Sequence, residues 1–185
     1  LNNPTQLGYR MPAEWEPHVG TWLTWPRAEG ISFPGTYNRI PPVLAKMIRA
    51  LATGEKVFIN VWDDAMEEEV RTHLETHEAL SCNVEFYHHQ AYEPWCRDHG
   101  PIFVKSKSKR AVINWGYNAW GEKYPPYDLE DRIPEHIARI RGINCIDGGM
   151  ILEGGSIEVN GAGTLLTTES CLLNPNRNPE LSRYQ

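Results

Sequence analysis

Long apolar runs, clusters of positive charge and paired cysteines are all missing from this sequence of 185 residues. No stretch approaches the ~18 consecutive apolar residues that a membrane-spanning helix requires, and no signal-peptide pattern follows Leu1. We therefore expect no membrane partner. Because the first residue is not methionine, targeting by a segment further upstream is left open.

Positive charge is scarce along the whole chain. The formal net charge is -6, and the one short basic segment, residues 105–110, lies between two strand-like runs, where a hairpin tip is the simplest interpretation. An acidic balance of this kind argues against a nucleic-acid partner and favours a small cationic ligand.

The cysteines are spread too widely to form a C-x-x-C pair: Cys82, Cys96, Cys145 and Cys171. They resemble reduced thiols more than a disulfide framework, which favours a cytoplasmic location. One group of metal-ligating residue types is close in sequence, but its spacing matches no common structural zinc site: His88, His89, Cys96 and His99. We predict no metal site.

What the sequence does contain is enough for one globular domain with a sizeable core, since 41% of the residues are hydrophobic and 10% aromatic. Apolar spacing predicts alternating strands and helices, and hence an α/β (α+β) protein. The expected strands cover residues 21–25, 56–62, 83–88, 102–104, 110–115, 143–146, 150–153, 156–159 and 164–167. The nearly continuous apolar run of residues 56–62 suggests burial on both faces, the glycine pair at 148–149 is expected to turn the chain, and the last two strands are expected to form a hairpin around residues 160–163. The expected helices cover residues 43–51, a stretch that Asp63 or Asp64 can cap, and residues 128–140. In the first helix, five apolar residues are expected to share the buried face: Val43, Leu44, Met47, Ile48 and Leu51.

One segment, residues 94–101 (PWCRDHGP), gathers an acid, a cation, an indole and an imidazole at a Gly-Pro corner. Its turn residues predict that Asp98 lies on a loop or a strand end rather than in a helix. A carboxylate beside an aromatic ring can bind a planar cation through two parallel hydrogen bonds and stacking. The alternative is a structural ion pair between Arg97 and Asp98 beside a buried Trp95.

A second acid occupies a comparable place. Glu153 precedes a glycine pair and a short alternating strand, and the elements around Asp98 and Glu153 both read as strand, helix, strand, acidic turn, strand. This is a weak internal repeat of long period, which is typical of a pseudo-symmetric fold whose units converge on a shared centre. We therefore expect the two carboxylates to lie close together.

Several runs resemble the motifs of the agmatine deiminases, in the same order along the chain: residues 11–18 (MPAEWEPH), 94–101 (PWCRDHGP), 118–121 (NAWG), 153–157 (EGGSI) and 163–179 (GTLLTTESCLLNPNRNP). Bacterial-type peptidylarginine deiminases share the Arg-Asp and Glu-Gly-Gly elements. The resemblance implies the pentein fold, in which repeated ββαβ units form a propeller around a central site. This chain would supply about two to three of the five units.

The same resemblance implies hydrolysis of agmatine to N-carbamoylputrescine and ammonia through a covalent thiol intermediate, without a metal or organic cofactor, in cytoplasmic polyamine biosynthesis. It implies that Asp98 grips the substrate guanidinium and that Glu153 faces the guanidinium while pairing with a catalytic histidine. It also implies a pocket lined by Trp95, Asn118 and Trp120, with Glu14 as a candidate for binding the far amine of the substrate.

The sequence departs from the family pattern in what it does not contain. The family's nucleophilic cysteine and catalytic histidine lie in segments beyond these residues, so residues 1–185 would form the N-terminal part of a single catalytic domain. Cys171 matches a family position that is expected to be in the core. Cys96, whose pKa a neighbouring arginine would lower, and His99 occupy variable positions of their motif.

Other hypotheses stay open. One is a different guanidine-modifying enzyme of the same fold, either a peptidylarginine deiminase or an amidinotransferase. Another is a non-catalytic module that binds guanidines or amines. If the chain is instead the N-terminal part of an agmatine deiminase, the 185 residues alone should release no ammonia from agmatine. Homo-oligomerisation is left open, although an incomplete propeller exposes unpaired strands that favour association.

Overall fold

The computed structural model describes residues 3–184, whose contacts divide into two compact units. The 17–96 unit consists of one continuous segment, Pro17–Cys96. The 97–184 unit consists of the chain from Arg97 onward together with the segment that ends at Glu16. No helix within the described residues combines the length and the apolar character needed to cross a membrane.

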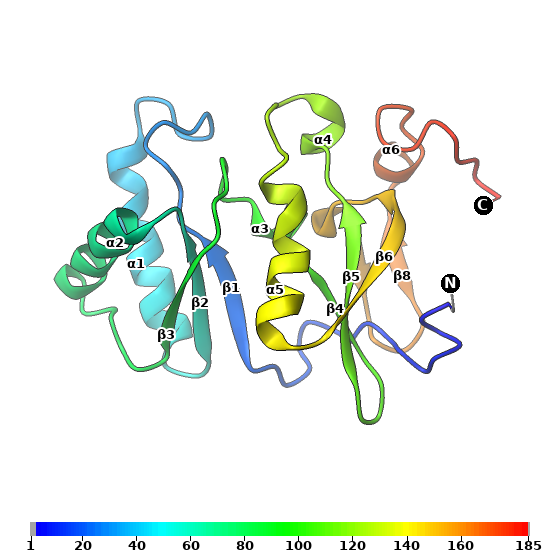
Figure 1. The fold of residues 1–185 in the computed structure, drawn as a ribbon, viewed down its shortest axis with the longest axis horizontal. Helices are drawn as coiled ribbons and strands as arrows, with labels where there is room; N and C mark the ends of the chain where they lie inside the picture. The colour runs from blue at the N-terminus through cyan, green and yellow to red at the C-terminus, as the bar shows by residue number, and fades with distance from the viewer. Residues whose placement is uncertain (1–2, 185) are drawn as a thin grey trace. The chain divides into compact units, whose positions relative to one another are not determined.

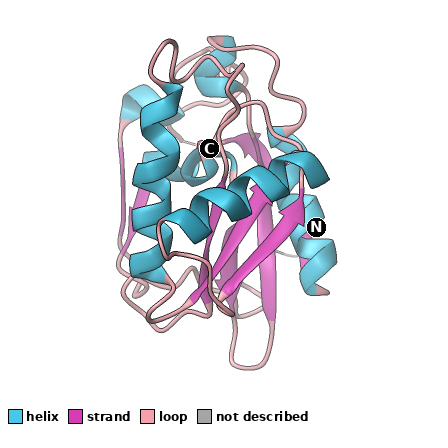
Figure 2. Cartoon of the chain, turned by 90° about the vertical axis from the view of Figure 1, so that its left-hand side faces the viewer, coloured by secondary structure: helices cyan, strands magenta, loops and turns pink. Residues whose placement is uncertain are grey.

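The 17–96 unit is a parallel α/β sheet. Its strands are β1 (Gly20–Thr24), β2 (Lys56–Val61) and β3 (Val84–His88), in the order β1-β2-β3, and its helices are η1 (Tyr37–Arg39), α1 (Ile40–Leu51) and α2 (Asp64–Thr76). Both longer helices pack on one face of the sheet (Figures 1 and 2), where Val57, Ile59 and Val61 meet Ile48 and Leu74 in a common core. The nearly continuous apolar sequence of β2 forms a strand buried along most of its length, as predicted, and β2 is the central strand of the sheet.

Helix α1 begins three residues earlier than the spacing predicted, at Ile40, because the prolines that follow occupy the first helical turn, where a missing N–H costs nothing. Its buried face also differs from the prediction. Ile48 and Ala45 are fully buried, whereas Val43 and Met47 are 53% and 46% exposed. The apolar stripe is therefore narrower than the sequence suggested.

Helix α2 begins as predicted. The Asp63 carboxylate accepts a hydrogen bond from the backbone N–H of Met66 at 2.9 Å, which caps the helix. Asp64 and Glu67 lie in the first turn, where negative charge stabilises the helix dipole.

The 97–184 unit contains one complete ββαβ arrangement (Figure 1). It consists of β4 (Ile102–Lys105), β5 (Arg110–Gly116), α5 (Ile133–Arg141), which follows the short 3₁₀ turn η2 (Glu130–Arg132), and β6 (Asn144–Ile151). Strand β4 is antiparallel to β5, and β5 is parallel to β6. Ile133 and Ile137 are buried on the inner side of α5, which packs on β5 and β6. This arrangement is the unit of the pentein fold that the sequence predicted.

Strand β6 differs from the prediction of two strands separated by a turn. The pairing of β5 with β6 shifts register between Asn114 and Gly116, so the glycine pair forms a bulge within one strand. A Cβ on Gly148 would lie 2.2 Å from the ring of Trp115, and Gly149 has a φ of 73°. Gly148 therefore leaves space for the indole, and the chain does not reverse at this pair.

The remaining elements of this unit are short: α3 (Cys96–His99), at whose first residue the division between the units falls, α4 (Ala119–Glu122), η3 (Gly154–Ser156), β7 (Ile157–Val159), β8 (Leu165–Thr167) and α6 (Glu169–Leu172). Strands β7 and β8 form the predicted hairpin. Its turn is closed by Asn160, whose Oδ1 accepts the backbone N–H groups of Ala162 and Thr164.

Candidate functional site

Asp98 lies in a single helical turn, α3, which corrects the prediction of a loop or strand end. The turn residues Pro94 and Gly100, which suggested a loop, instead flank this one turn. Strand β4 then begins at Ile102, four residues after the acid.

Glu153 occupies a matching position. It is the N-terminal flanking residue of the 3₁₀ turn η3, and β7 begins at Ile157, again four residues after the acid. The prediction that each acid lies at a turn that leads into a strand is therefore confirmed.

The two acidic motifs lie directly against each other. A Cβ on Gly154 would lie 2.3 Å from the carbonyl oxygen of Arg97, and a Cβ on Gly155 would lie 2.3 Å from Oδ1 of Asp98. The backbone N–H of Gly155 also donates a hydrogen bond to the Asp98 carboxylate. The glycine pair after Glu153 is thus what lets the second motif approach the first.

The surroundings of Asp98 disfavour its charged form. Burial raises the pKa of the Asp98 carboxyl above its ordinary value, and the negative charge of Glu153 raises it further. The N–H of Gly155 and the charge of Arg97 act in the opposite direction but do not cancel these two effects. A cation bound beside Asp98 would relieve this cost, so the geometry suits a positively charged ligand.

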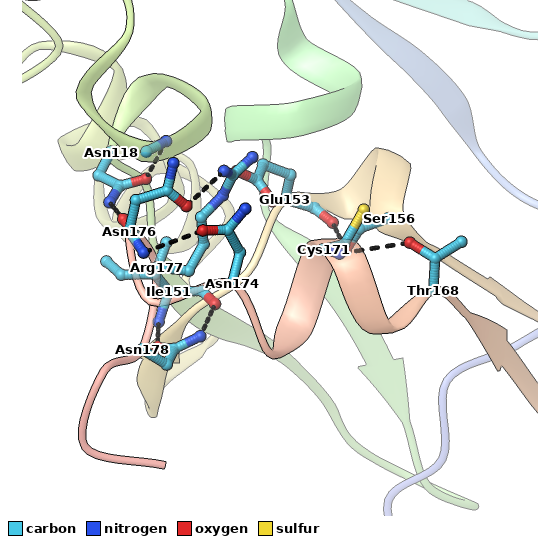
Figure 3. Close-up of polar contacts among 11 residues, drawn as sticks. Asn118, Ile151, Glu153, Ser156, Thr168, Cys171, Asn174, Asn176, Arg177 and Asn178 are labelled. Carbon is cyan, nitrogen blue, oxygen red and sulfur yellow. Dashed lines mark hydrogen bonds and ion pairs between the residues drawn. The ribbon is translucent and has the colours of Figure 1, made fainter. Parts of the chain in front are cut away.

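Glu153 already has a cationic partner within the chain. Nε of Arg177 donates to Oε1 of Glu153 at 2.9 Å (Figure 3), and the two side chains are only 8% and 4% exposed. Arg177 belongs to one of the runs that carry the family resemblance, residues 163–179. The sequence gives no signal for this contact, because the two residues are 24 positions apart and belong to different turns.

Asn118 and Trp120 lie at a left-handed turn of backbone. Four consecutive residues have positive φ: Ala119 (49°), Trp120 (58°), Gly121 (85°) and Glu122 (60°). Asn118 holds this turn, because its Oδ1 accepts the N–H of Gly121 and its Nδ2 donates to the carbonyl of Asn176, both at 2.9 Å (Figure 3). The side chain of Trp120 packs edge-on between Tyr117 and Tyr124.

A cavity of about 500 Å³ opens beside this turn. Asn118 and Arg177 line it, together with Tyr127, Glu122 and Asp131. Within residues 3–184, neither acid of the two motifs is among its lining residues. Of the predicted pocket residues, the structure thus brings Asp98 and Glu153 together at one place and Asn118 to the wall of the cavity. Arg177 lines the same cavity and binds Glu153.

Trp95 and Glu14 have contacts of their own. Trp95 belongs to the 17–96 unit, is 41% exposed, and donates its indole N–H to Oγ of Ser32 at 2.8 Å. Glu14 belongs to the other unit and forms an ion pair with Arg97. The alternative ion pair between Arg97 and Asp98 is therefore replaced by one between Arg97 and Glu14.

The thiols and the imidazole near the motif have structural surroundings. Sγ of Cys96 donates to the carbonyl oxygen of Trp22 at 3.3 Å. His99 is 2% exposed and packs edge-on against Tyr117, with 5.8 Å between ring centroids. Cys171, expected in the core, is only half-buried at the start of the C-terminal segment.

Residues 10–185 match the model of one protein family, the Porphyromonas-type peptidyl-arginine deiminases. The chain belongs to this family. Its relatives include the agmatine deiminase of Pseudomonas aeruginosa, 36% identical over 195 residues, and that of Medicago truncatula, 37% identical over 198 residues. Both alignments cover all of this chain but only 51% and 50% of the relatives, so the chain spans about half the length of these proteins.

Solved structures of this family share the fold. The agmatine deiminase of Enterococcus faecalis matches with a TM-score of 0.88 and 30% identity, over 98% of this chain and 49% of that one. A Cys-to-Ser variant of the C. jejuni agmatine deiminase, solved with substrate bound, matches with a TM-score of 0.82 and 25% identity, over 96% of this chain and 50% of that one.

Proposed function

We propose that the whole protein hydrolyses a guanidine C–N bond and that agmatine is its substrate, with N-carbamoylputrescine and ammonia as products. The observation that carries the proposal is the convergence of Asp98 and Glu153, in which the glycines after one acid pack against the backbone and the carboxylate of the other. Family membership and the relatives named agmatine deiminase support the choice of reaction and substrate.

The chemistry explains why acids are needed. A guanidinium stays protonated at any ordinary pH, and its delocalised charge makes its central carbon a poor electrophile. A carboxylate that binds two of its N–H groups fixes the plane of the group and offsets the charge while a nucleophile approaches. In this proposal Asp98 holds the substrate, and the raised pKa of its carboxyl falls again when the cation binds.

The covalent step requires residues outside this chain. A cysteine thiolate attacks the guanidinium carbon, ammonia leaves after protonation by a histidine, and water activated by that histidine releases the product from the thiol. Glu153 is proposed to orient this histidine from its buried position. Accordingly, the isolated 185-residue chain should release no ammonia from agmatine. Turnover by this chain would mean that the nucleophile lies within these residues.

Replacing Asp98 by Asn in the complete protein tests the proposal. The side chain keeps its shape but loses its charge, so kcat/KM for agmatine should fall by about 10²–10³-fold, the loss typical of removing one electrostatic contact to a transition state. Ammonia release measures the rate. Unchanged kinetics would return Asp98 to a structural role.

A second candidate is hydrolysis of peptidyl-arginine, which the name of the matching family favours. The role proposed for Glu14 would distinguish the two, because an acid that binds the far amine of agmatine has no partner in a peptide. In this structure Glu14 binds Arg97, so agmatine would have to displace that guanidinium. Comparing ammonia release from agmatine with release from an arginine-containing peptide decides between them.

A further inference from the structure

The Arg177–Glu153 ion pair joins two parts of the candidate site. Nε of Arg177 binds Glu153, and Nη1 donates to Oδ1 of Asn176 at 2.9 Å (Figure 3). Burying two charges costs several kcal/mol per ion, and apolar residues of the same volume often serve stability equally well. The stability of the fold is therefore a weak reason for a pair that is more than nine-tenths buried on both sides.

The contacts continue from Arg177 to the left-handed turn. The carbonyl of Asn176 accepts the Asn118 side chain, and Asn118 in turn accepts the N–H of Gly121. A Cβ on Gly121 would lie only 2.2 Å from Nδ2 of Asn176, so the two segments are in close contact. One chain of hydrogen bonds thus runs from Glu153 through Arg177 to the backbone that carries Trp120.

The side chain of arginine is suited to hold a carboxylate such as that of Glu153 in one orientation. Its guanidinium is charged at any ordinary pH and presents several donors in one rigid plane. Because the ion pair uses Oε1 of Glu153, the other carboxylate oxygen, Oε2, can accept a different partner. We infer that Arg177 is a positioning residue: it fixes the orientation of Glu153 toward the reacting groups and ties that orientation to the turn that holds Asn118 and Trp120.

This inference rests on the proposed function. It also differs from a general requirement for ion pairs near the C-terminal end of the described residues. Arg183 and Glu169 form another arginine–glutamate pair there, but their side chains are 63% and 71% exposed. Exposed pairs of this kind contribute little to stability. Arg183→Met therefore provides a matched control, because it removes the same type of group at a position with no link to Glu153.

The experiment uses the complete protein, with ammonia release from agmatine and thermal unfolding measured on the same samples. Arg177→Met should lower kcat by about 100-fold, the size of effect expected when a catalytic group is displaced by about 1 Å, and should change KM by less than about 3-fold. Arg177→Lys should be intermediate, because one ammonium cannot reproduce both directed N–H groups. Arg183→Met should match the wild type in both measurements.

A second background separates positioning from folding. Glu153→Asp shortens the acid by one methylene and withdraws it from Arg177, so Arg177→Met should cost less than about 3-fold in this background if Arg177 acts through Glu153. Equal losses in both backgrounds would overturn the inference, as would a folded Arg177→Met protein with the kcat of the wild type. If Arg177→Met does not fold, the Arg177→Lys variant carries the same comparison.

Turnover by the wild-type protein tests the proposed function separately. A wild type that acts on peptidyl-arginine but not on agmatine would correct the substrate, and the ratios for Arg177 would then be measured on the peptide. A wild type inactive on both would overturn the function and this inference together. A flat response to Arg177 substitution in an active protein would overturn the inference alone.

Discussion

Asp98 and Glu153 both lie four residues before a strand, but in two different surroundings. Asp98 lies within the helical turn α3, whereas Glu153 is an extended residue that precedes the 3₁₀ turn η3. Asp98 accepts a neutral backbone N–H, whereas Glu153 accepts a hydrogen bond from the charged guanidinium of Arg177. The first acid carries a net cost of ionisation, and the second is in contact with a buried cation of the same chain. The comparison teaches that two acids at the same distance before a strand can serve different purposes. One carboxylate can bind an external cation, and the other is held in place by a cation of the same chain.

Apart from the Asp98→Asn substitution itself, the largest effect on activity should come from a side chain placed between the two turns. Gly155→Ala would place a methyl group 2.3 Å from Oδ1 of Asp98 and would force the carboxylate to move. We expect kcat/KM for the complete protein to fall by about 100-fold, because a displacement of that size costs about two orders of magnitude. Gly54→Ala is the control, since nothing lies within 4 Å of a Cβ there. Full activity in Gly155→Ala would show that the contact is not needed.

A smaller effect should follow from removing the contacts that hold Ile151, the last residue of β6, two residues before Glu153. Oδ1 of Asn178 accepts the N–H of Ile151 at 2.8 Å, and Nδ2 donates to the carbonyl of the same residue at 2.9 Å (Figure 3). Asn178→Ala leaves both backbone groups without these partners, so denaturant unfolding should report a loss of about 1–3 kcal/mol. Asn178→Asp keeps only the acceptor and should also be destabilising. An unchanged midpoint in both variants would mean that the end of β6 is held by other contacts.

The smallest effect concerns stability and pH at Asp98. Because folding raises the pKa of this carboxyl, the folded protein holds the proton more tightly than the unfolded chain does. Wild-type stability should therefore decrease as pH rises from the ordinary carboxyl pKa of about 4 through the raised value. Asp98→Asn lacks this loss, so its unfolding midpoint should exceed that of the wild type increasingly across that window and by a constant amount above it.

The control for the pH experiment is an exposed acid of the same 97–184 unit. Glu180 is exposed, and Glu180→Gln should follow the wild-type curve. A pH-independent difference between Asp98→Asn and the wild type would contradict the assigned burial of the charge. Asp98→Asn should therefore be more stable than the wild type at neutral pH and, in the kinetic test, less active.

Local chemistry in the sequence was sufficient for much of the fold. The continuous apolar run of β2, the cap at Asp63 and the hairpin around Asn160 all form as predicted, because each depends on neighbours within a few residues. The comparable places of Asp98 and Glu153 were also visible, since the same order of strand, helix, strand, acidic turn and strand surrounds each acid in the sequence.

Features that depend on distant segments could not be predicted. The ion pair of Glu153 with Arg177 joins separate turns, and the burial of Val43 or Met47 depends on what packs on the outer side of α1. The glycine pair of β6 was interpreted as a turn because its sequence does not reveal that Trp115, on another strand, needs the space. In each case the deciding contact is tertiary.

The left-handed turn at residues 119–122 has a consequence for any effort to stabilise this protein. A left-handed conformation costs roughly 1–2 kcal/mol for each residue with a side chain, and three of the four residues here are not glycine. A search for more heat-resistant variants would therefore favour glycine at Ala119 or Glu122. Such variants would gain thermal tolerance by lowering the strain of this loop, and their activity should be checked before they are kept, because the neighbouring indole would become easier to move.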